Sequence, residues 1–266
     1  MPFATLDSAE LYYEIEGDTG PWLIFAHGGG SNHLVWWKQV GAFRDRYRCV
    51  VYDARWHGMT RATGSPEEAG DTAWRDLLGL MDALKIDRAF VNGHSMGGGA
   101  VSGLALNHPA RVQGAIMSGT TFGFQTAAMQ RWAGEMLDKI PKGFRIEDNT
   151  YAPDFAQRES ALHYLHMAMR RFNPPRPIPR YSKGYLAYYE TMQKTPPRDY
   201  SAVKVPFLFV LAEQDTLQVP WLVEATAQAV PGARLARIAN SGHGMQVEQP
   251  EAYKAALAEF LDAHRG

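Results

Sequence analysis

A serine stands between two glycines in the order Gly93-His94-Ser95-Met96-Gly97. A serine hydroxyl is a weak nucleophile, and enzymes make it reactive by presenting it on a strained turn between a strand and a helix. Glycines two positions before and after the serine allow that turn, because they let the strand and helix approach without Cβ clashes. The free N–H groups at the start of the helix can bind an oxyanion. Ser95 is therefore a candidate nucleophile.

A nucleophilic serine needs a general base, and the base needs an acid that orients it. His243 lies in a short loop after the last predicted strand, between Gly242 and Gly244. Asp215 follows directly on the strand before that one, where ligands gather in open α/β sheets. We predict His243 as the base and Asp215 as the acid. Glu213 is the competing carboxylate in the same loop.

A run of three glycines, Gly28 to Gly30, follows the apolar segment 22–26 and His27. Such a loop can turn backbone N–H groups into a cavity, which suits an oxyanion donor. It could equally be a flexible connector, and the glycines alone do not decide between the two. The loop lacks the Lys-Ser/Thr of a P-loop, so it does not predict nucleotide binding.

These residues must be positioned by alternating strands and helices. Continuous apolar runs and helical stripes of apolar residues alternate along most of the chain, which predicts a mostly parallel sheet with helices on both faces. Strands are expected at residues 11–16, 22–26, 48–53, 88–91, 112–118, 206–211 and 234–238, and helices at residues 34–44, 71–85, 96–107, 221–230 and 251–264.

The alternation breaks between residues 121 and 200, a stretch rich in aromatic residues, methionine and proline. We expect helices at 126–139 and 156–171, and a third around 185–193. The expected organisation is an α/β core made of residues 1–120 and 201–266, with residues 121–200 inserted as a helical cap.

Composition and charge narrow the classes of function that this chain could have. A formal net charge of −1 with 45% apolar residues gives no sign of a nucleic-acid or membrane partner. The single cysteine, Cys49, lies in an apolar strand-like run and is expected to be a buried, inert thiol. The N-terminal residues resemble no leader sequence, so a cytoplasmic protein is expected. No metal-ligand cluster or cofactor fingerprint is found, and the oligomeric state stays open.

Together these motifs resemble the α/β-hydrolase superfamily, over residues 10 to 264 apart from the cap. In that superfamily the chain order of the triad is Ser, Asp, His. A serine at position 95 argues against the aspartate chemistry of haloalkane dehalogenases and epoxide hydrolases. The motifs are His27-Gly28-Gly29-Gly30, Asp53 to His57-Gly58, Gly93-His94-Ser95-Met96-Gly97-Gly98, Asp215 to Pro220 and Gly242-His243.

The resemblance also implies roles for main-chain groups. The oxyanion donors would be the backbone N–H groups of Met96 and of Gly29, with Gly28 as the alternative to Gly29. The run Arg55-Trp56-His57 departs from the family's usual small residue before the histidine. For His57 we expect a structural hydrogen-bonding role and not a catalytic one.

The sequence thus predicts a cofactor-independent serine hydrolase acting on an ester or lactone of an apolar or aromatic small molecule. Three alternatives remain: hydrolysis of a carbon–carbon bond in a vinylogous diketone, perhydrolysis by the same residues, and a ligand receptor that has lost turnover. A cap arginine reaching a substrate carboxylate would favour the first, and Arg131, Arg158, Arg170 and Arg171 are candidates. Predicted substrate-binding residues are Gly28, Gly30, Trp36, Phe122, Trp132 and Met245.

Overall fold

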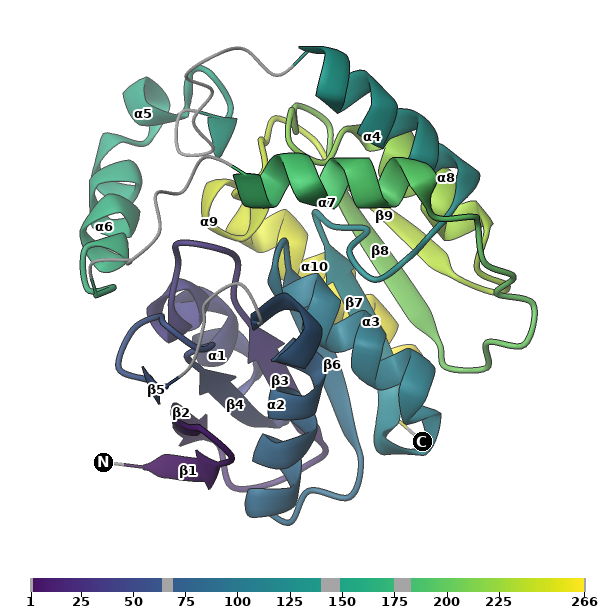
Figure 1. Cartoon of the computed structure of the whole chain (residues 1–266). Helices are drawn as coiled ribbons and strands as arrows, with labels where there is room; N and C mark the ends of the chain where they lie inside the picture. Colours follow the sequence, from purple (N-terminus) through teal and green to yellow (C-terminus); the bar gives the residue numbers. More distant parts are fainter. Residues whose placement is uncertain (1, 64–68, 140–148, 175–182, 266) are drawn as a thin grey trace.

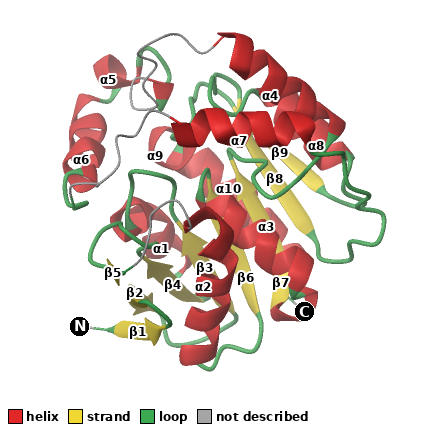
Figure 2. Ribbon diagram, viewed as in Figure 1, coloured by secondary structure: helices red, strands yellow, loops and turns green. Residues whose placement is uncertain are grey.

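The fold is a twisted nine-stranded sheet with helices on both faces (Figures 1 and 2). The computed structural model describes residues 2–63, 69–139, 149–174 and 183–265. The strand order is β1-β2-β4-β3-β6-β7-β8-β9, and β5 pairs with β2. The strands are β1 (Phe3–Leu6), β2 (Ala9–Glu16), β3 (Trp22–Ala26), β4 (Arg48–Tyr52), β5 (Arg61–Ala62), β6 (Ala89–His94), β7 (Val112–Ser118), β8 (Phe207–Ala212) and β9 (Arg234–Ile238).

From β4 to β9 neighbouring strands run parallel, whereas β1, β2 and β5 are antiparallel. Every residue of β6 and of β8 is buried, as expected of central strands covered on both faces. The helices outside the segment that joins β7 and β8 are α1 (Trp37–Phe43), α2 (Ala69–Ala83), α3 (Gly97–Asn107), α8 (Pro220–Gln228), α9 (Met245–Glu248) and α10 (Pro250–Ala263).

Side chains that alternate along each strand form two cores, one on each face of the sheet. In β3, Ile24 joins the core packed under α2, α3 and α8, whereas Phe25 joins the core packed under α1 and α10. The apolar runs predicted as strands are therefore buried from both sides. The predicted fold class, an α/β-hydrolase fold with a mostly parallel sheet, is confirmed.

Several boundaries differ from the prediction. The helix expected at 156–171 is two helices, α5 (Phe155–Arg158) and α6 (Ser160–Arg170), because Glu159 between them leaves the helical conformation with φ −133° and ψ 53°. The first turn of the helix expected at 34–44 is a 3-10 helix, His33–Trp36. The prediction missed β1, β5 and α9, which are too short to carry a periodic pattern.

Between β7 and β8 the chain forms α4 (Ala127–Lys139), α5, α6 and α7 (Lys183–Lys194). Helices α4 and α7 pack together next to α8, and α5 and α6 form a separate group on the other side of the molecule (Figure 1). The core shared by α4, α7 and α8 contains Met129, Trp132, Ala133, Tyr189 and Leu222.

Cys49 is buried in the sheet, as predicted, and burial raises the pKa of its thiol to about 12. Because the thiolate is the nucleophilic form of cysteine, this side chain is inert at neutral pH. Over the described part of the chain, no helix has both the length and the apolar character needed to cross a membrane.

Candidate active site

Five loops that carry the sequence motifs leave the same edge of the sheet. They follow the carboxyl ends of β3, β4, β6, β8 and β9. All five strands belong to the parallel part of the sheet. Parallel strands place their carboxyl ends along one edge, so residues far apart in the sequence meet there. The candidate site lies on this edge.

Ser95 lies between the last residue of β6 and the first turn of α3. Its φ is +51°, in the left-handed region that non-glycine residues seldom adopt. Its N–H donates to the carbonyl of Ser118 at 3.0 Å, and its own carbonyl accepts from the N–H of Gly98 at 2.9 Å. These two bonds hold the strained turn in place, which is a common feature of functional sites.

The glycines around Ser95 permit close contact between main chains. A Cβ atom on Gly93 would lie 2.4 Å from the carbonyl oxygen of Gly97, and one on Gly97 would lie 2.3 Å from the carbonyl oxygen of Ala26. Both distances are far inside van der Waals contact, so any larger residue would push strand and helix apart. The predicted reason for glycine two residues before and after Ser95 is confirmed.

The glycine loop lies against this turn. A Cβ on Gly28 would be 3.2 Å from the Cβ of Ser95, and one on Gly29 would be 3.9 Å from the Cβ of Met96. The main chain of the loop therefore comes close to the residue that carries the candidate nucleophile and to the residue after it. This is the neighbourhood in which an oxyanion hole would have to lie.

His243 and Asp215 form a buried pair. The Nδ1 atom of His243 is 2.7 Å from Oδ2 of Asp215, and both side chains are almost fully buried. Oδ1 of the same carboxylate accepts from the N–H groups of Leu217 and Gln218 at 2.8 and 2.9 Å. The competing carboxylate, Glu213, is exposed to solvent. Asp215, and not Glu213, is therefore the carboxylate in contact with His243.

The loop of His243 is tied to the segment that contains α5. Glu248 is buried and accepts from the N–H of Gly242 and from the N–H of Ala152, both at 3.0 Å. The N–H of Gly244 donates to the carbonyl of Thr150 at 2.7 Å. Burial raises the pKa of Glu248 above that of an ordinary glutamate, although its two backbone hydrogen bonds act in the opposite direction.

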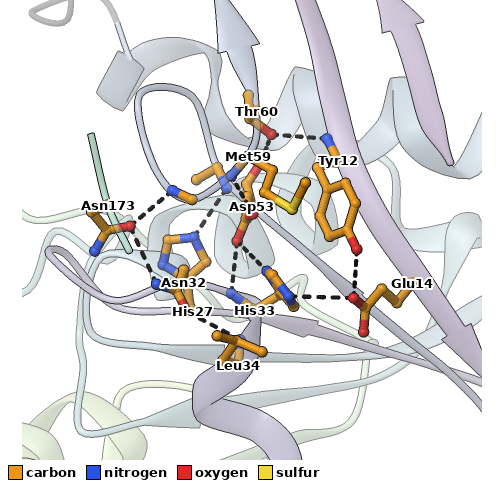
Figure 3. Close-up of polar contacts among 12 residues, drawn as sticks. Tyr12, Glu14, His27, Asn32, His33, Leu34, Asp53, Met59, Thr60 and Asn173 are labelled. Atoms are coloured by element: carbon orange, nitrogen blue, oxygen red, sulfur yellow. Dashed lines mark hydrogen bonds and ion pairs between the residues drawn. The ribbon is translucent and has the colours of Figure 1, made fainter. Parts of the chain in front are cut away.

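Asp53 connects the residues that follow the glycine loop to the loop after β4 (Figure 3). Its buried carboxylate accepts from the N–H of His33 at 2.7 Å and from the N–H of Met59 at 2.8 Å, and it lies 2.9 Å from Nδ1 of His33. Burial by itself raises the pKa of Asp53, but the hydrogen bond from His33 and the charge of His27 hold it below its usual value. One carboxylate thus fixes two loops at the sheet edge.

His57 has the structural role predicted for it. Its Nε2 accepts from the N–H of Gly30 at 3.3 Å, and its Nδ1 is 2.8 Å from the carbonyl oxygen of Arg55. A carbonyl only accepts, so the proton is on Nδ1. The histidine therefore joins the loop after β4 to the glycine loop after β3.

Asn173, just after α6, was not predicted to be part of the site. Its side chain donates to the carbonyl of Gly30 at 2.9 Å and accepts from the N–H of Gly58 at 2.8 Å. Its amide oxygen also accepts from the side chain of Asn32 at 3.5 Å (Figure 3). Nearby, the side chain of Asn32 donates to the carbonyl of Met169 at 2.8 Å. These partners are separated by 115 to 143 positions in the sequence, and no local pattern could have indicated them.

A family model described as alpha/beta hydrolase fold matches residues 21–250. The chain belongs to this family. Among proteins that this α/β-hydrolase is similar to, RutD of Azorhizobium caulinodans, which is named as a carbamate hydrolase, is 27% identical over 98% of both chains. The 3-oxoadipate enol-lactonase 2 of Acinetobacter baylyi is 24% identical, over 97% of this chain and 95% of its own.

The same fold is found in a crystal structure of the enol-lactonase from Burkholderia xenovorans LB400. It superposes with a TM-score of 0.75 at 24% sequence identity, over 98% of this chain and 100% of the other. The likeness at this level of identity concerns the fold.

Two of the residues predicted to bind substrate in this α/β-hydrolase, Trp36 and Gly30, have structural contacts of their own. Trp36 is fully buried and packs between the rings of Phe25 and Tyr253 in the core under α1 and α10. Gly30 directs its N–H to His57 and its carbonyl to Asn173. These contacts give both residues a structural role, and substrate binding by them stays a prediction. The sequence could not separate the two roles, because an aromatic residue near a glycine loop suits either.

The other predicted positions lie closer to the candidate site. The Cε of Met245 would be 2.9 Å from a Cβ on Gly119, a position that is also 3.5 Å from Oδ2 of Asp215. Phe122 packs edge-to-face on Tyr188, with ring centroids 5.2 Å apart, and a Cβ on Gly99 in α3 would be 3.9 Å from it.

Trp132 is 3% exposed and packs edge-to-face on Tyr189, with ring centroids 5.1 Å apart. Packing among α4, α7 and α8 accounts for its burial. We therefore assign Trp132 to the core of these helices.

His33 is expected to make the stability of this α/β-hydrolase depend on pH. Burial by itself lowers the pKa of His33, but the hydrogen bond to Asp53 and the charges of Asp53 and Glu14 raise it above 6.5. A raised folded-state pKa stabilises the fold below about pH 6.5, and this contribution is lost as pH rises through the folded-state value. The slope is at most about 1.4 kcal/mol per pH unit.

The measurement is the free energy of unfolding of wild type and of His33→Gln between pH 5 and 9. We expect the difference between the two proteins to shrink as the pH rises. Using the difference removes the contributions of other groups, such as His94 and His166, whose lowered pKa values act in the opposite direction. A difference that stays constant with pH would contradict the assignment.

Proposed function

We propose that this protein is a serine hydrolase that cleaves a carboxylic ester or lactone of an apolar or aromatic small molecule through an acyl-enzyme intermediate. The observation that carries the proposal is the buried pair between His243 and Asp215, at the sheet edge to which β6 delivers Ser95 on a turn with φ +51°. A serine on such a turn, with an oriented histidine on the same edge, is the arrangement required for acyl transfer.

In the proposed mechanism, Asp215 accepts a hydrogen bond from the Nδ1–H group of His243, so Nε2 carries the lone pair and acts as general base. His243 removes the hydroxyl proton of Ser95 as the oxygen attacks the acyl carbon. The tetrahedral oxyanion is stabilised by the backbone N–H groups of Met96 and Gly29. His243 then gives its proton to the leaving alcohol. A water molecule, activated by the same histidine, finally releases the acid.

We assign residues 121–200 as a cap over this site. The support is the set of bonds from this segment to both catalytic loops: Asn173 to the glycine loop, and Thr150 and Ala152 to the loop of His243, the latter through Glu248. Substrate would then lie between the sheet edge and the cap, against Phe122 and Met245.

The similarity to a protein named as an enol-lactonase supports the lactone class, and the similarity to RutD favours a carbamate as a second candidate. Both substrates present an acyl carbon to the same nucleophile, so the proposed residues serve either. Comparing kcat/KM on a matched nitrophenyl ester and nitrophenyl carbamate would rank them. A pre-steady-state burst of nitrophenol equal to the enzyme concentration would support turnover through an acyl-enzyme and exclude a ligand receptor.

A carbon–carbon bond hydrolase would need a free arginine near the site. Arg131 pairs with Glu135 and lies over the ring of Trp221, and Arg158 donates to the carbonyl of Asn240. Arg170 forms a hydrogen bond with Tyr151, a residue that packs against Gly242 and Gly244 in the loop of His243. We retain the ester or lactone reaction as the main proposal and carbon–carbon bond hydrolysis, with Arg170 or Arg171 as the arginine, as the alternative.

For the acyl group, we expect kcat/KM to rise with chain length from acetate to a medium chain or an aromatic ring. Each buried methylene is worth about 0.8 kcal/mol, which is about fourfold in affinity. The measurement is kcat/KM on a series of nitrophenyl alkanoates and the benzoate. A profile that peaks at acetate and declines with length would contradict an apolar acyl site and leave the proposed triad untouched.

A further inference from the structure

The mechanism proposed above makes no use of His94, the residue immediately before Ser95. Its Nε2 is 2.9 Å from the main-chain carbonyl oxygen of His243, and the centroids of the two imidazole rings are 4.8 Å apart. A carbonyl oxygen only accepts, so Nε2 of His94 must be the donor and carry the proton. A buried side chain beside the candidate nucleophile thus binds the main chain of the candidate base.

In this tautomer the other ring nitrogen, Nδ1, carries the lone pair. Nδ1 of His94 is buried, and it has no hydrogen-bond partner within the described part of the chain. It faces the glycine loop, where a Cβ on Gly28 would lie 2.6 Å from it. Burial, together with the nearby charge of His243, holds the pKa of His94 well below that of an ordinary histidine. His94 therefore stays neutral, with its single proton on the nitrogen that faces the carbonyl of His243.

Among the hydrogen bonds that hold the main chain around His243, three connect it to different parts of the fold. The N–H of Gly242 donates to Glu248, the N–H of Gly244 donates to the carbonyl of Thr150, and the carbonyl of His243 accepts from His94. The first two come from α9 and from the segment before α5. The third comes from the end of β6, and it therefore joins the loop of His243 to the turn that carries Ser95.

We infer that His94 is a positioning residue that sets the distance between Ser95 and His243. This inference rests on the proposed function. Asp215 orients the imidazole of His243 from one side, but that bond does not fix where the loop stands relative to the nucleophile. The bond from His94 does so, because His94 and Ser95 are consecutive residues on a rigid strand end.

A neutral imidazole at His94 suits the positioning role. His243 becomes positively charged when it takes the proton of Ser95, and a second positive charge on the neighbouring ring would oppose that step. His94 cannot replace His243 as base, because its Nε2 is occupied by the carbonyl and its lone pair lies on the buried Nδ1. The effect of His94 on the reaction is therefore exerted through His243.

The test compares His94→Gln with His94→Met. Glutamine carries an amide N–H at nearly the reach of Nε2, whereas methionine has similar length and no donor. We expect His94→Met to lower kcat by about 10²-fold with little change in KM, since a displacement of about 1 Å can cost that much. His94→Gln should recover most of the loss. His94→Leu replaces the methionine variant if that protein does not fold.

Equal loss of kcat in both variants, or no loss in either, would overturn the inference. A second readout needs no turnover and so separates this inference from the proposed function. This readout is the NMR signal of the Nδ1 proton of His243, measured in Ser95→Ala protein with isotope-labelled histidine. This proton should exchange with water faster after His94→Met and stay protected after His94→Gln. The same exchange rate in both would overturn the positioning role, whatever the enzyme hydrolyses.

Discussion

Ser95→Ala is expected to lower kcat by about 10⁴- to 10⁶-fold while the protein stays folded. The alanine removes the only atom proposed to form the acyl-enzyme bond, and residues that act as a catalytic unit lose nearly all their benefit when one is removed. The backbone is not expected to respond, because the strained φ of +51° is held by main-chain bonds to Ser118 and Gly98. The measurements are kcat on a nitrophenyl ester and the thermal unfolding midpoint.

Ser102→Ala is the matched control, since Ser102 lies in α3 and its hydroxyl donates to the carbonyl of Phe122. That variant should keep a kcat close to that of wild type. A fluorophosphonate should label wild type with one equivalent, mapped to Ser95 by mass spectrometry, and should leave Ser95→Ala unlabelled. Stoichiometric labelling of any other residue would refute the assignment of Ser95 as nucleophile.

Asp215→Asn is expected to lower kcat by about 10⁴-fold. Oδ1 would still accept from the N–H groups of Leu217 and Gln218, so the loop should keep its shape. An amide N–H₂ in place of Oδ2 would donate to Nδ1 of His243. The proton of the imidazole would then sit on Nε2, and the base would have no lone pair for the hydroxyl of Ser95.

Glu213→Gln is the control for this substitution. It makes the same chemical change two residues earlier in the same loop, on a residue that is exposed to solvent. It should leave kcat unchanged. If Glu213→Gln were inactive and Asp215→Asn retained full activity, the assignment of the acid would be wrong, although the structural contact between Asp215 and His243 would remain.

The fold could be predicted from the sequence because its signals are local. Central strands such as β6 and β8 are buried on both faces and read as continuous apolar runs, and the turn at Ser95 requires glycine at fixed spacing. Parallel strands deliver the loops that follow them to one edge, so the positions of Ser95, Asp215 and His243 after strands were enough to predict that they share a region. Their catalytic roles stay predictions.

Local signals fail where a residue has more than one plausible partner. Trp36 near the glycine loop suited a substrate contact, and in the structure it packs on Phe25 and Tyr253 in the core under α1 and α10. The loop after β8 contains two carboxylates, Glu213 and Asp215. Only the structure shows that the carboxylate of Asp215 is the one that contacts His243.

The sequence by itself determined the succession of most strands, helices and loops along the chain. It also determined the short list of candidate catalytic residues, because apolar periodicity and glycine spacing act over a few residues. Tertiary structure alone decided how those loops are held. Asn173 binds the glycine loop and His94 binds the carbonyl of His243 across separations of 143 and 149 positions. Such bonds form only once packing has brought the segments together. Nothing in the residues next to them specifies the partner.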